Sequence, residues 1–257
     1  MTVWAIADIH LAISTPQKTM EVFGPSWKNY HQKIQDNWND LVSPNDLVLI
    51  AGDISWAMRI EEAKIDLDWI HALPGTKVMI KGNHDYWWGS LNKLQQILPP
   101  SIHLIQNNSF FWNGVAIGGA RLWDSNEYNF DKIIEFQETP ASVVIHEESR
   151  EDPKTTEKIF SRELGRLETS LKSMDPRARH KIVMTHYPPI SFWENDKEPN
   201  ASQVSRLLEK YKVNACIFGH LHAVKKNLHP FHTKNGVDYI FVAGDYLDFK
   251  PVKVLDL

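Results

Sequence analysis

Short apolar runs rich in β-branched residues alternate along the chain with segments in which apolar residues recur every three or four positions. The short runs are typical of buried strands, whereas the second spacing places apolar side chains on one face of a helix. Strand and helix in alternation predict an α/β protein. The expected strands are 3–7, 47–51, 77–81, 102–106, 115–119, 181–185, 215–218 and 239–243.

Four segments show the helical spacing. One of them stops before Pro74-Gly75, a pair that ends helices. Another follows Asn200, the expected N-cap, with Gln203 three residues further on as in a capping box. The longest, about 155–174, keeps its stripe for only about two heptads, which favours a core face over a partner-binding zipper. The four stripes comprise Tyr30, Ile34, Trp38 and Leu41; Ala63, Leu67 and Ile70; Phe160, Leu164, Leu167, Leu171 and Met174; and Val204, Leu207, Leu208 and Tyr211.

We expect a single domain over residues 1–257 with one insertion. No internal repeat, low-complexity tract or clear linker interrupts the alternation. The stretch 126–153 departs from it and ends in strongly charged sequence. A loop of this length is either a solvated excursion or a lid over a site, and the sequence leaves both interpretations open.

Charge and composition limit the partners. The 257 residues include 28 Lys and Arg against 32 Asp and Glu, a net charge of −4, so nucleic acid is not an expected partner. No secretory signal follows Met1, and no apolar run approaches the roughly 18 residues of a membrane span, which predicts a cytoplasmic protein. The single Cys216 excludes a disulfide framework and a cysteine-rich zinc site, and we expect it in the core.

Five of the expected strands lead directly into residues that bind metals or transfer protons. In α/β sheets, ligands bind beyond the carboxyl ends of the strands, so these residues are expected to converge on one crevice. Glycine at three of the ends lets the chain turn sharply or approach a ligand closely. The strand ends read Asp8-Ile9-His10, Gly52-Asp53, Gly82-Asn83-His84-Asp85, His186 and Gly219-His220-Leu221-His222.

The donor atoms point to a catalytic metal site. Two Asp, one Asn and four His without sulfur favour Mn, Fe, Zn or Co in a catalytic site over a structural zinc. The members of Asp8-x-His10 lie two residues apart, as do those of His220-x-His222, so an extended backbone would point each pair the same way. Two ions need only one shared donor, and Asp53, alone on its strand end, is the natural bridge.

These blocks resemble the calcineurin-like metallophosphoesterase superfamily, whose motifs D-x-H, G-D, G-N-H-[DE], H and G-H-x-H stand in this order over residues 8–222. The stretches 52–58, 82–88 and 122–124 resemble its bacterial phosphohydrolases. The resemblance implies two mixed β-sheets packed as a sandwich, flanked by helices, with a dinuclear centre at the carboxyl ends of the strands. It implies that one ion is held by Asp8, His10, Asp53 and His222 and the other by Asp53, Asn83, His186 and His220.

The mechanism expected from this resemblance is hydrolysis of a small phosphomonoester or phosphodiester. Two ions, Mn first with Fe, Zn or Co as alternatives, would hold a bridging hydroxide that attacks phosphorus. His84 would act as the general acid for the leaving group, with Asp85 orienting its ring. Two divalent cations and two aspartates leave about +2, so an anionic substrate is attracted although the chain is acidic.

Departures from the family motifs make some subfamilies less favoured, and further residues are candidates for substrate contact. The second block lacks the G-D-x-x-D-R-G of protein Ser/Thr phosphatases, and Trp56 stands where purple acid phosphatases have a metal-binding Tyr. We expect Trp56 and Trp123 to line the cleft and Arg121 to contact a phosphate. A pyrophosphate-bond hydrolase and a nuclease remain alternatives, as does a catalytically silent scaffold, although the ligand positions are intact.

Overall fold

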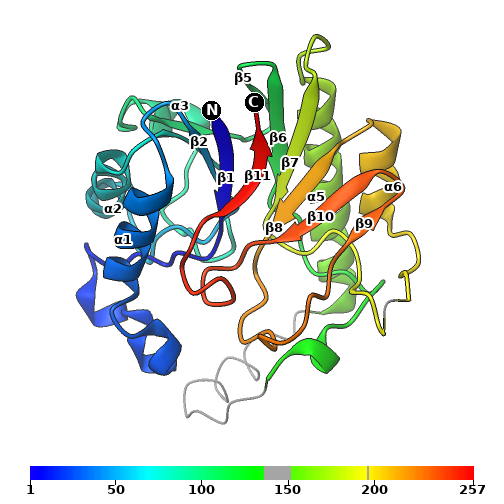
Figure 1. Ribbon diagram of the computed structural model, residues 1–257, viewed down its shortest axis with the longest axis horizontal. Coiled ribbons are helices and arrows are strands. Elements are labelled where there is room, and N and C mark those ends of the chain that lie inside the picture. Colours follow the sequence, from blue (N-terminus) through cyan, green and yellow to red (C-terminus); the bar gives the residue numbers. More distant parts are fainter. Residues whose placement is uncertain (136–151, 196) are drawn as a thin grey trace.

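The strands pair into two sheets that lie face to face. A computed structural model describes residues 1–135, 152–195 and 197–257 (Figure 1). The first sheet has the strand order β11-β1-β2-β3-β4 and the second the order β5-β6-β7-β8-β10-β9. The first contains β1 (Thr2–Ile6), β2 (Leu47–Ile50), β3 (Thr76–Met79), β4 (Ile102–Leu104) and β11 (Val252–Asp256). The second contains β5 (Phe110–Trp112), β6 (Val115–Ala120), β7 (His180–Thr185), β8 (Ala215–Phe218), β9 (Thr233–Lys234) and β10 (Val237–Phe241).

Parallel strands form the middle of both sheets, and antiparallel strands lie at one edge of the first sheet and at both edges of the second. β1 to β4 are parallel neighbours, as are β6, β7, β8 and β10. β11, β5 and β9 each pair antiparallel with the strand beside them. Both sheets are therefore mixed, as expected, and the carboxyl ends of the parallel strands of each sheet meet at one edge.

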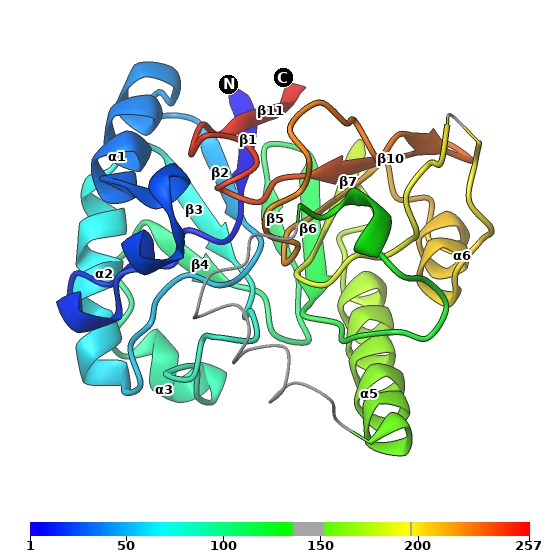
Figure 2. The same cartoon turned by 90° about the horizontal axis from the view of Figure 1, so that it is seen from below.

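Helices cover the outer face of each sheet (Figure 2). α1 (Tyr30–Leu41) and α2 (Ile60–Ala72) pack on the first sheet, with the short α3 (Leu91–Gln95) beside them. α5 (Pro153–Lys172) and α6 (Gln203–Lys210) pack on the second. The result is the α/β/β/α sandwich that the sequence predicts. Among the described residues, no helix has both the length and the apolar character needed to cross a membrane.

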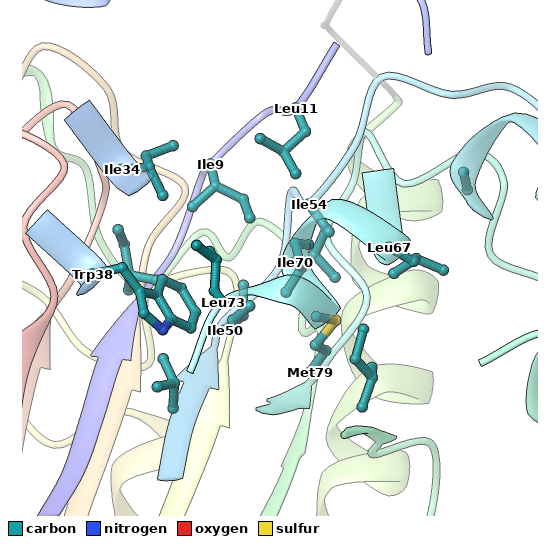
Figure 3. Close-up of a cluster of buried hydrophobic side chains, with 14 of the residues drawn as sticks. Ile9, Leu11, Ile34, Trp38, Ile50, Ile54, Leu67, Ile70, Leu73 and Met79 are labelled. Carbon is teal, nitrogen blue, oxygen red and sulfur yellow. The ribbon is translucent and has the colours of Figure 1, made fainter. Parts of the chain in front are cut away.

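The alternation along the strands builds separate cores on the two faces of each sheet. In β8, Ala215 and Ile217 belong to the core between the sheets, whereas Cys216 and Phe218 face the helices. Cys216 is fully buried there, as expected. Figure 3 shows the outer core of the first sheet, where the indole of Trp38 lies near the strands. Successive side chains of a strand point to opposite faces, so one sequence run serves two layers.

The structure departs from the sequence prediction in four short elements. The edge strands β5, β9 and β11 and the five-residue α3 were not expected, because they are too short or too polar to carry a clear period. In the stretch 126–153, residues 136–151 lie outside the described part of the chain. The choice between a lid and a solvated loop therefore stays open. The described portion before residues 136–151 joins the second half of the chain through a bridge between Ile134 and Val224.

The N-cap of α6 also differs from the expectation. Ser202, not Asn200, caps the helix: its Oγ accepts from the backbone N–H of Ser205 at 2.9 Å and donates to the carbonyl of Pro189 at 2.6 Å. Ser202 is buried, whereas Asn200 is exposed. The spacing from Asn200 to Gln203 therefore does not mark a capping box. Ser202 is also a residue type preferred at the N-cap, and it lies directly before the helix.

Replacing Ser202 with alanine is expected to lower the free energy of unfolding by about 1–3 kcal/mol, because it removes a cap and leaves the buried carbonyl of Pro189 without its donor. Asn200→Ala is the matched control and should change the stability by less than about 0.5 kcal/mol. Urea unfolding followed by circular dichroism measures both. Equal losses in the two variants would restore Asn200 as the cap.

Candidate metal centre

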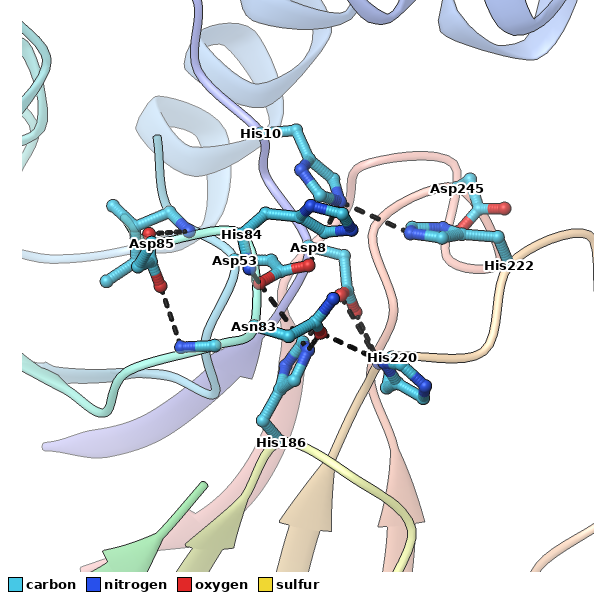
Figure 4. Close-up of polar contacts among 12 residues, drawn as sticks. Asp8, His10, Asp53, Asn83, His84, Asp85, His186, His220, His222 and Asp245 are labelled. Carbon is cyan, nitrogen blue, oxygen red and sulfur yellow. Dashed lines mark hydrogen bonds and ion pairs between the residues drawn. The ribbon is translucent and has the colours of Figure 1, made fainter. Parts of the chain in front are cut away.

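The sequence-predicted ligands gather at the carboxyl ends of β1, β2, β3, β7 and β8 (Figure 4). His10 Nε2 lies 3.2 Å from His222 Nε2 and 3.5 Å from Asp53 Oδ2. On the other side, His186 Nε2 lies 3.5 Å from Asp53 Oδ1. Asp53 thus lies between the two histidine groups, where the sequence expects a bridge. Within the described residues, two triplets have ligand atoms all within 4.8 Å of one another: Asp8, His10 and His222, and Asp8, Asp53 and His186.

Asn83 and His220 complete the group. Asn83 Oδ1 lies 2.6 Å from His186 Nε2 and 3.2 Å from His220 Nδ1. The backbone N–H of His220 donates to Asp8, at 3.0 Å from Oδ2. All seven expected donors therefore lie within one network of contacts.

The backbone that presents these donors is not extended, contrary to the expectation for the two D-x-H and H-x-H pairs. Asp8, His10, Asp53 and His220 have positive φ values of 54°, 41°, 51° and 72°. Such a left-handed conformation costs about 1–3 kcal/mol for a non-glycine residue and clusters at functional sites. Backbone hydrogen bonds hold it here, from Asp8 N to the Gly52 carbonyl and from His10 N to the Asp53 carbonyl, both at 3.0 Å. The side chains converge because the chain turns at each ligand.

Two glycines stand where the ligand carboxylates need their space. A Cβ atom at Gly82 would overlap the Asp53 carboxylate, and one at Gly219 would overlap that of Asp8. Any larger residue at either position would displace a ligand. Gly82 and Gly219 are therefore required by close approach, whereas Gly52, the third glycine expected at a strand end, also has a positive φ of 94°.

Hydrogen bonds fix the ring of His186 and show which nitrogen is free. His186 Nδ1 donates to the carbonyl of Ala51 at 3.0 Å. Burial lowers the pKa of His186 to about 3, so the ring is neutral and Nε2 carries a lone pair. This lone pair faces Asn83 Oδ1, another electron-pair donor, at 2.6 Å. A cation shared by the two atoms would stabilise this contact.

Asp245 orients His222 in the same way, and the sequence analysis missed it. His222 Nδ1 donates to Asp245 Oδ1 at 3.1 Å, and the backbone N–H of Ala223 donates to Oδ2 at 2.9 Å. A histidine that ligates a metal usually donates its other ring N–H to such a partner. The signal was present, because Gly244-Asp245 follows β10 as Gly52-Asp53 follows β2.

The charges of the centre suit divalent metal ions. Burial raises the pKa of both Asp8 and Asp53, whose carboxyl groups have almost no access to solvent. Burial together with neighbouring imidazoles lowers the pKa of His10 and His220 well below the usual value, which leaves both rings neutral. Buried carboxylates need a counter-charge and neutral imidazoles offer lone pairs, so a cation satisfies both.

His222 is the exception among the histidines. Burial lowers its pKa, but the carboxylates of Asp245, Asp8 and Asp53 outweigh this effect and raise the pKa to about 9. These three acids therefore draw positive charge to the ring. A divalent cation held by Asp8, His10 and His222 would satisfy the same acids.

The structure places His84 at the centre but does not place Asp85 on its ring. The His84 backbone N–H donates to Asp53 Oδ1 at 2.9 Å, while Nδ1 of its ring is buried without a hydrogen-bond partner. Asp85 accepts from the backbone N–H groups of Ile54, Ser55 and Gly82 at 2.7 to 3.1 Å. The expectation that Asp85 orients the His84 ring is wrong. The Asp85 carboxylate instead accepts three backbone hydrogen bonds and so joins the loop after Asp53 to the loop of Asn83.

The three residues expected to contact substrate lie around the centre. The indole of Trp56 stacks on His10, with ring centroids 5.2 Å apart, and also contacts the His84 ring at 4.6 Å. Trp123 contacts Tyr187 at 5.1 Å and helps to line a small cavity of about 70 Å³ that His220 also borders. The guanidinium of Arg121 lies 4.4 Å from the Trp123 ring. Contact of these residues with substrate stays a prediction.

The chain is similar to known proteins in sequence and in fold. The family model for calcineurin-like phosphoesterases matches residues 1–224. The Gene 66 protein of Mycobacterium phage D29 is 32% identical over 84 residues, which are 32% of this chain and 40% of the phage protein, so the match spans well under half of that relative. The crystal structure of phosphopantetheinyl hydrolase from Mycobacterium tuberculosis matches with a TM-score of 0.58 and 15% identity, over 100% of this chain and 96% of that one. At this identity the likeness shows a shared fold.

Replacing Asp245 with asparagine is expected to lower the affinity for divalent metal by about 10–100-fold, because a neutral amide replaces the carboxylate that polarises the His222 ring. Asp248→Asn, three residues further on, changes an exposed ion pair with Lys226 and is the matched control. Titration calorimetry with Mn²⁺ on metal-free protein measures both affinities. An unchanged affinity in Asp245→Asn would remove Asp245 from the centre.

Proposed function

The chain belongs to the calcineurin-like phosphoesterase family, and on that premise we propose that it hydrolyses a small phosphomonoester or phosphodiester with two divalent metal ions. The observation that carries this proposal is the enclosed set of carboxylates and neutral imidazoles whose free donor atoms face one another (Figure 4). Such a set without sulfur fits catalytic Mn, Fe, Zn or Co, of which we propose Mn first.

The ligands divide into two groups that share one residue. Asp8, His10 and His222 would hold one ion and Asn83, His186 and His220 the other, with Asp53 between them. The distances from the two carboxylate oxygens of Asp53 to opposite imidazoles, both 3.5 Å, support a bridging role. Divalent ions bound there would polarise phosphoryl oxygens and lower the pKa of water enough to supply a nucleophile near neutral pH.

The chain's own residues position the substrate and move a proton. Asp8 and Asp53 balance only part of the charge of two divalent ions, so the centre attracts an anionic phosphate. His84, whose backbone is fixed by Asp53, is the residue that we propose to protonate the leaving oxygen. The indole of Trp56 contacts the His84 ring and shields one side of it from water.

Metal dependence tests the proposed function directly. Protein stripped with a chelator is expected to be inactive toward p-nitrophenyl phosphate and bis(p-nitrophenyl) phosphate, and Mn²⁺ should restore hydrolysis of at least one of them, because the proposed nucleophile is water activated by the metal ions. Inductively coupled plasma analysis gives the bound metal in the same samples. Hydrolysis by metal-free protein would contradict the proposal, and two bound ions without any hydrolysis would favour a scaffold.

Replacing His84 with alanine is expected to slow hydrolysis of an alkyl phosphate by about 10²–10⁴-fold, because a poor leaving group needs a proton. The loss on a p-nitrophenyl ester should be far smaller, since that leaving group departs as a stable anion. Tyr86→Phe, which alters an exposed side chain two residues away, is the matched control and should leave both rates unchanged. Equal losses on the two esters, with metal content intact, would remove His84 as the general acid.

A further inference from the structure

A second cavity, of about 250 Å³, lies between the ends of β3 and β6 and one side of α5. Four of its lining side chains are cationic, Lys81, Arg121, Arg162 and Arg166, and Glu163 is the single acid among the described residues that line it. The formal balance of the lining is therefore +3, in a chain whose net charge is −4.

Glu163 holds the arginines together without neutralising them. Its carboxylate, which is 2% exposed, accepts from Arg166 Nη1 at 2.6 Å. The same Oε1 atom lies 3.7 Å from Arg121 Nη2 and 3.7 Å from Arg162 Nε. Each guanidinium carries five N–H donors, so one carboxylate leaves most of them for another acceptor. Three like charges gathered around one acid repel one another, and an anion in the cavity relieves that repulsion.

The cavity adjoins the metal centre through two shared strand ends. Lys81 leads into Gly82-Asn83, which carries a candidate ligand. The carbonyl of Arg121 accepts from the backbone N–H of His186, another candidate ligand, at 3.1 Å. The lining of the cavity is thus joined to two candidate ligands through the backbone, although the ligand side chains themselves do not line it.

We propose that this cavity binds a second phosphate group of the substrate while the metal centre holds the phosphate ester that reacts. The proposal rests on the proposed function and narrows it, because it makes the substrate class a phosphate ester with a second phosphate on the same molecule. Guanidinium groups suit this role, since their planar forks match the oxygens of a phosphate. Gln106 and Asn107, which also line the cavity, add neutral polar groups.

Binding of inorganic phosphate to metal-free protein tests the cavity apart from catalysis. Without metal, the centre offers phosphate the carboxylates of Asp8 and Asp53 beside the single raised-pKa imidazole of His222, so it is the dependence on Arg162 that assigns binding to the basic cavity. Titration calorimetry at low salt should give an affinity that falls about 5-fold in Arg162→Gln and further at high salt. Arg162→Lys should recover part of the loss. Lys158→Gln is the matched control, because it removes one charge from an exposed position on the same helix without touching the cavity lining.

The metal-loaded enzyme tests the link to substrate. Arg162→Gln should lower the preference for 1,3-propanediol bisphosphate over propyl phosphate, as a ratio of kcat/KM, by about 5-fold, and Lys158→Gln should leave the ratio unchanged. Wild-type protein that binds no phosphate, or Arg162→Gln that binds it equally well, would overturn the proposal even if the enzyme is active. Arginine-dependent phosphate binding by a protein that hydrolyses nothing would instead reject the proposed function and retain the anion site.

Discussion

Two carboxylates, Asp8 and Asp53, are buried side by side, and the rest of the site follows from the cost of that placement. An ionised carboxylate without water or a counter-charge is strongly unfavourable in a protein interior. The surrounding imidazoles of His10, His186 and His220 are kept neutral by burial, so they supply lone pairs and not positive charge. His222, whose pKa is raised to about 9, is the one imidazole of the group that carries positive charge, and it is shared among Asp245, Asp8 and Asp53. Divalent cations would supply the rest of the balance.

The sheets supply the rigidity that such a cluster needs. The parallel strands end together over a dry core between the two sheets, and the chain turns beyond them through left-handed residues. Partners behind the ligands keep these turns in place: Ala51 and Asp245 orient two imidazoles, and Asp85 ties the loop after Asp53 to the loop of Asn83. The basic cavity uses the same strand ends, so one frame positions both regions.

The sequence predicts the central strands and the gathering of the candidate ligands because both depend on local signals. Apolar runs mark the parallel strands, and strand-end chemistry marks Asp8, Asp53 and His186. The edge strands have no such signal, since they are short and half solvated. The roles of Asp85 and Asp245 escaped because they depend on which groups a carboxylate meets in space. Asp245 shared the strand–Gly–Asp pattern, but it follows a strand that the motif order does not include.

The contacts that assemble the centre join residues far apart in the chain. His10 meets His222 across a separation of 212 residues, and Asn83 meets His186 across 103. Contacts of this kind raise the contact order, so they form slowly and after local structure. A partly synthesised chain would contain only some of the candidate ligands, and these would not yet lie close together. It would therefore bind metal weakly. We therefore expect the nascent protein to compete poorly for metal until both sheets have closed, because only then do the candidate ligands lie together.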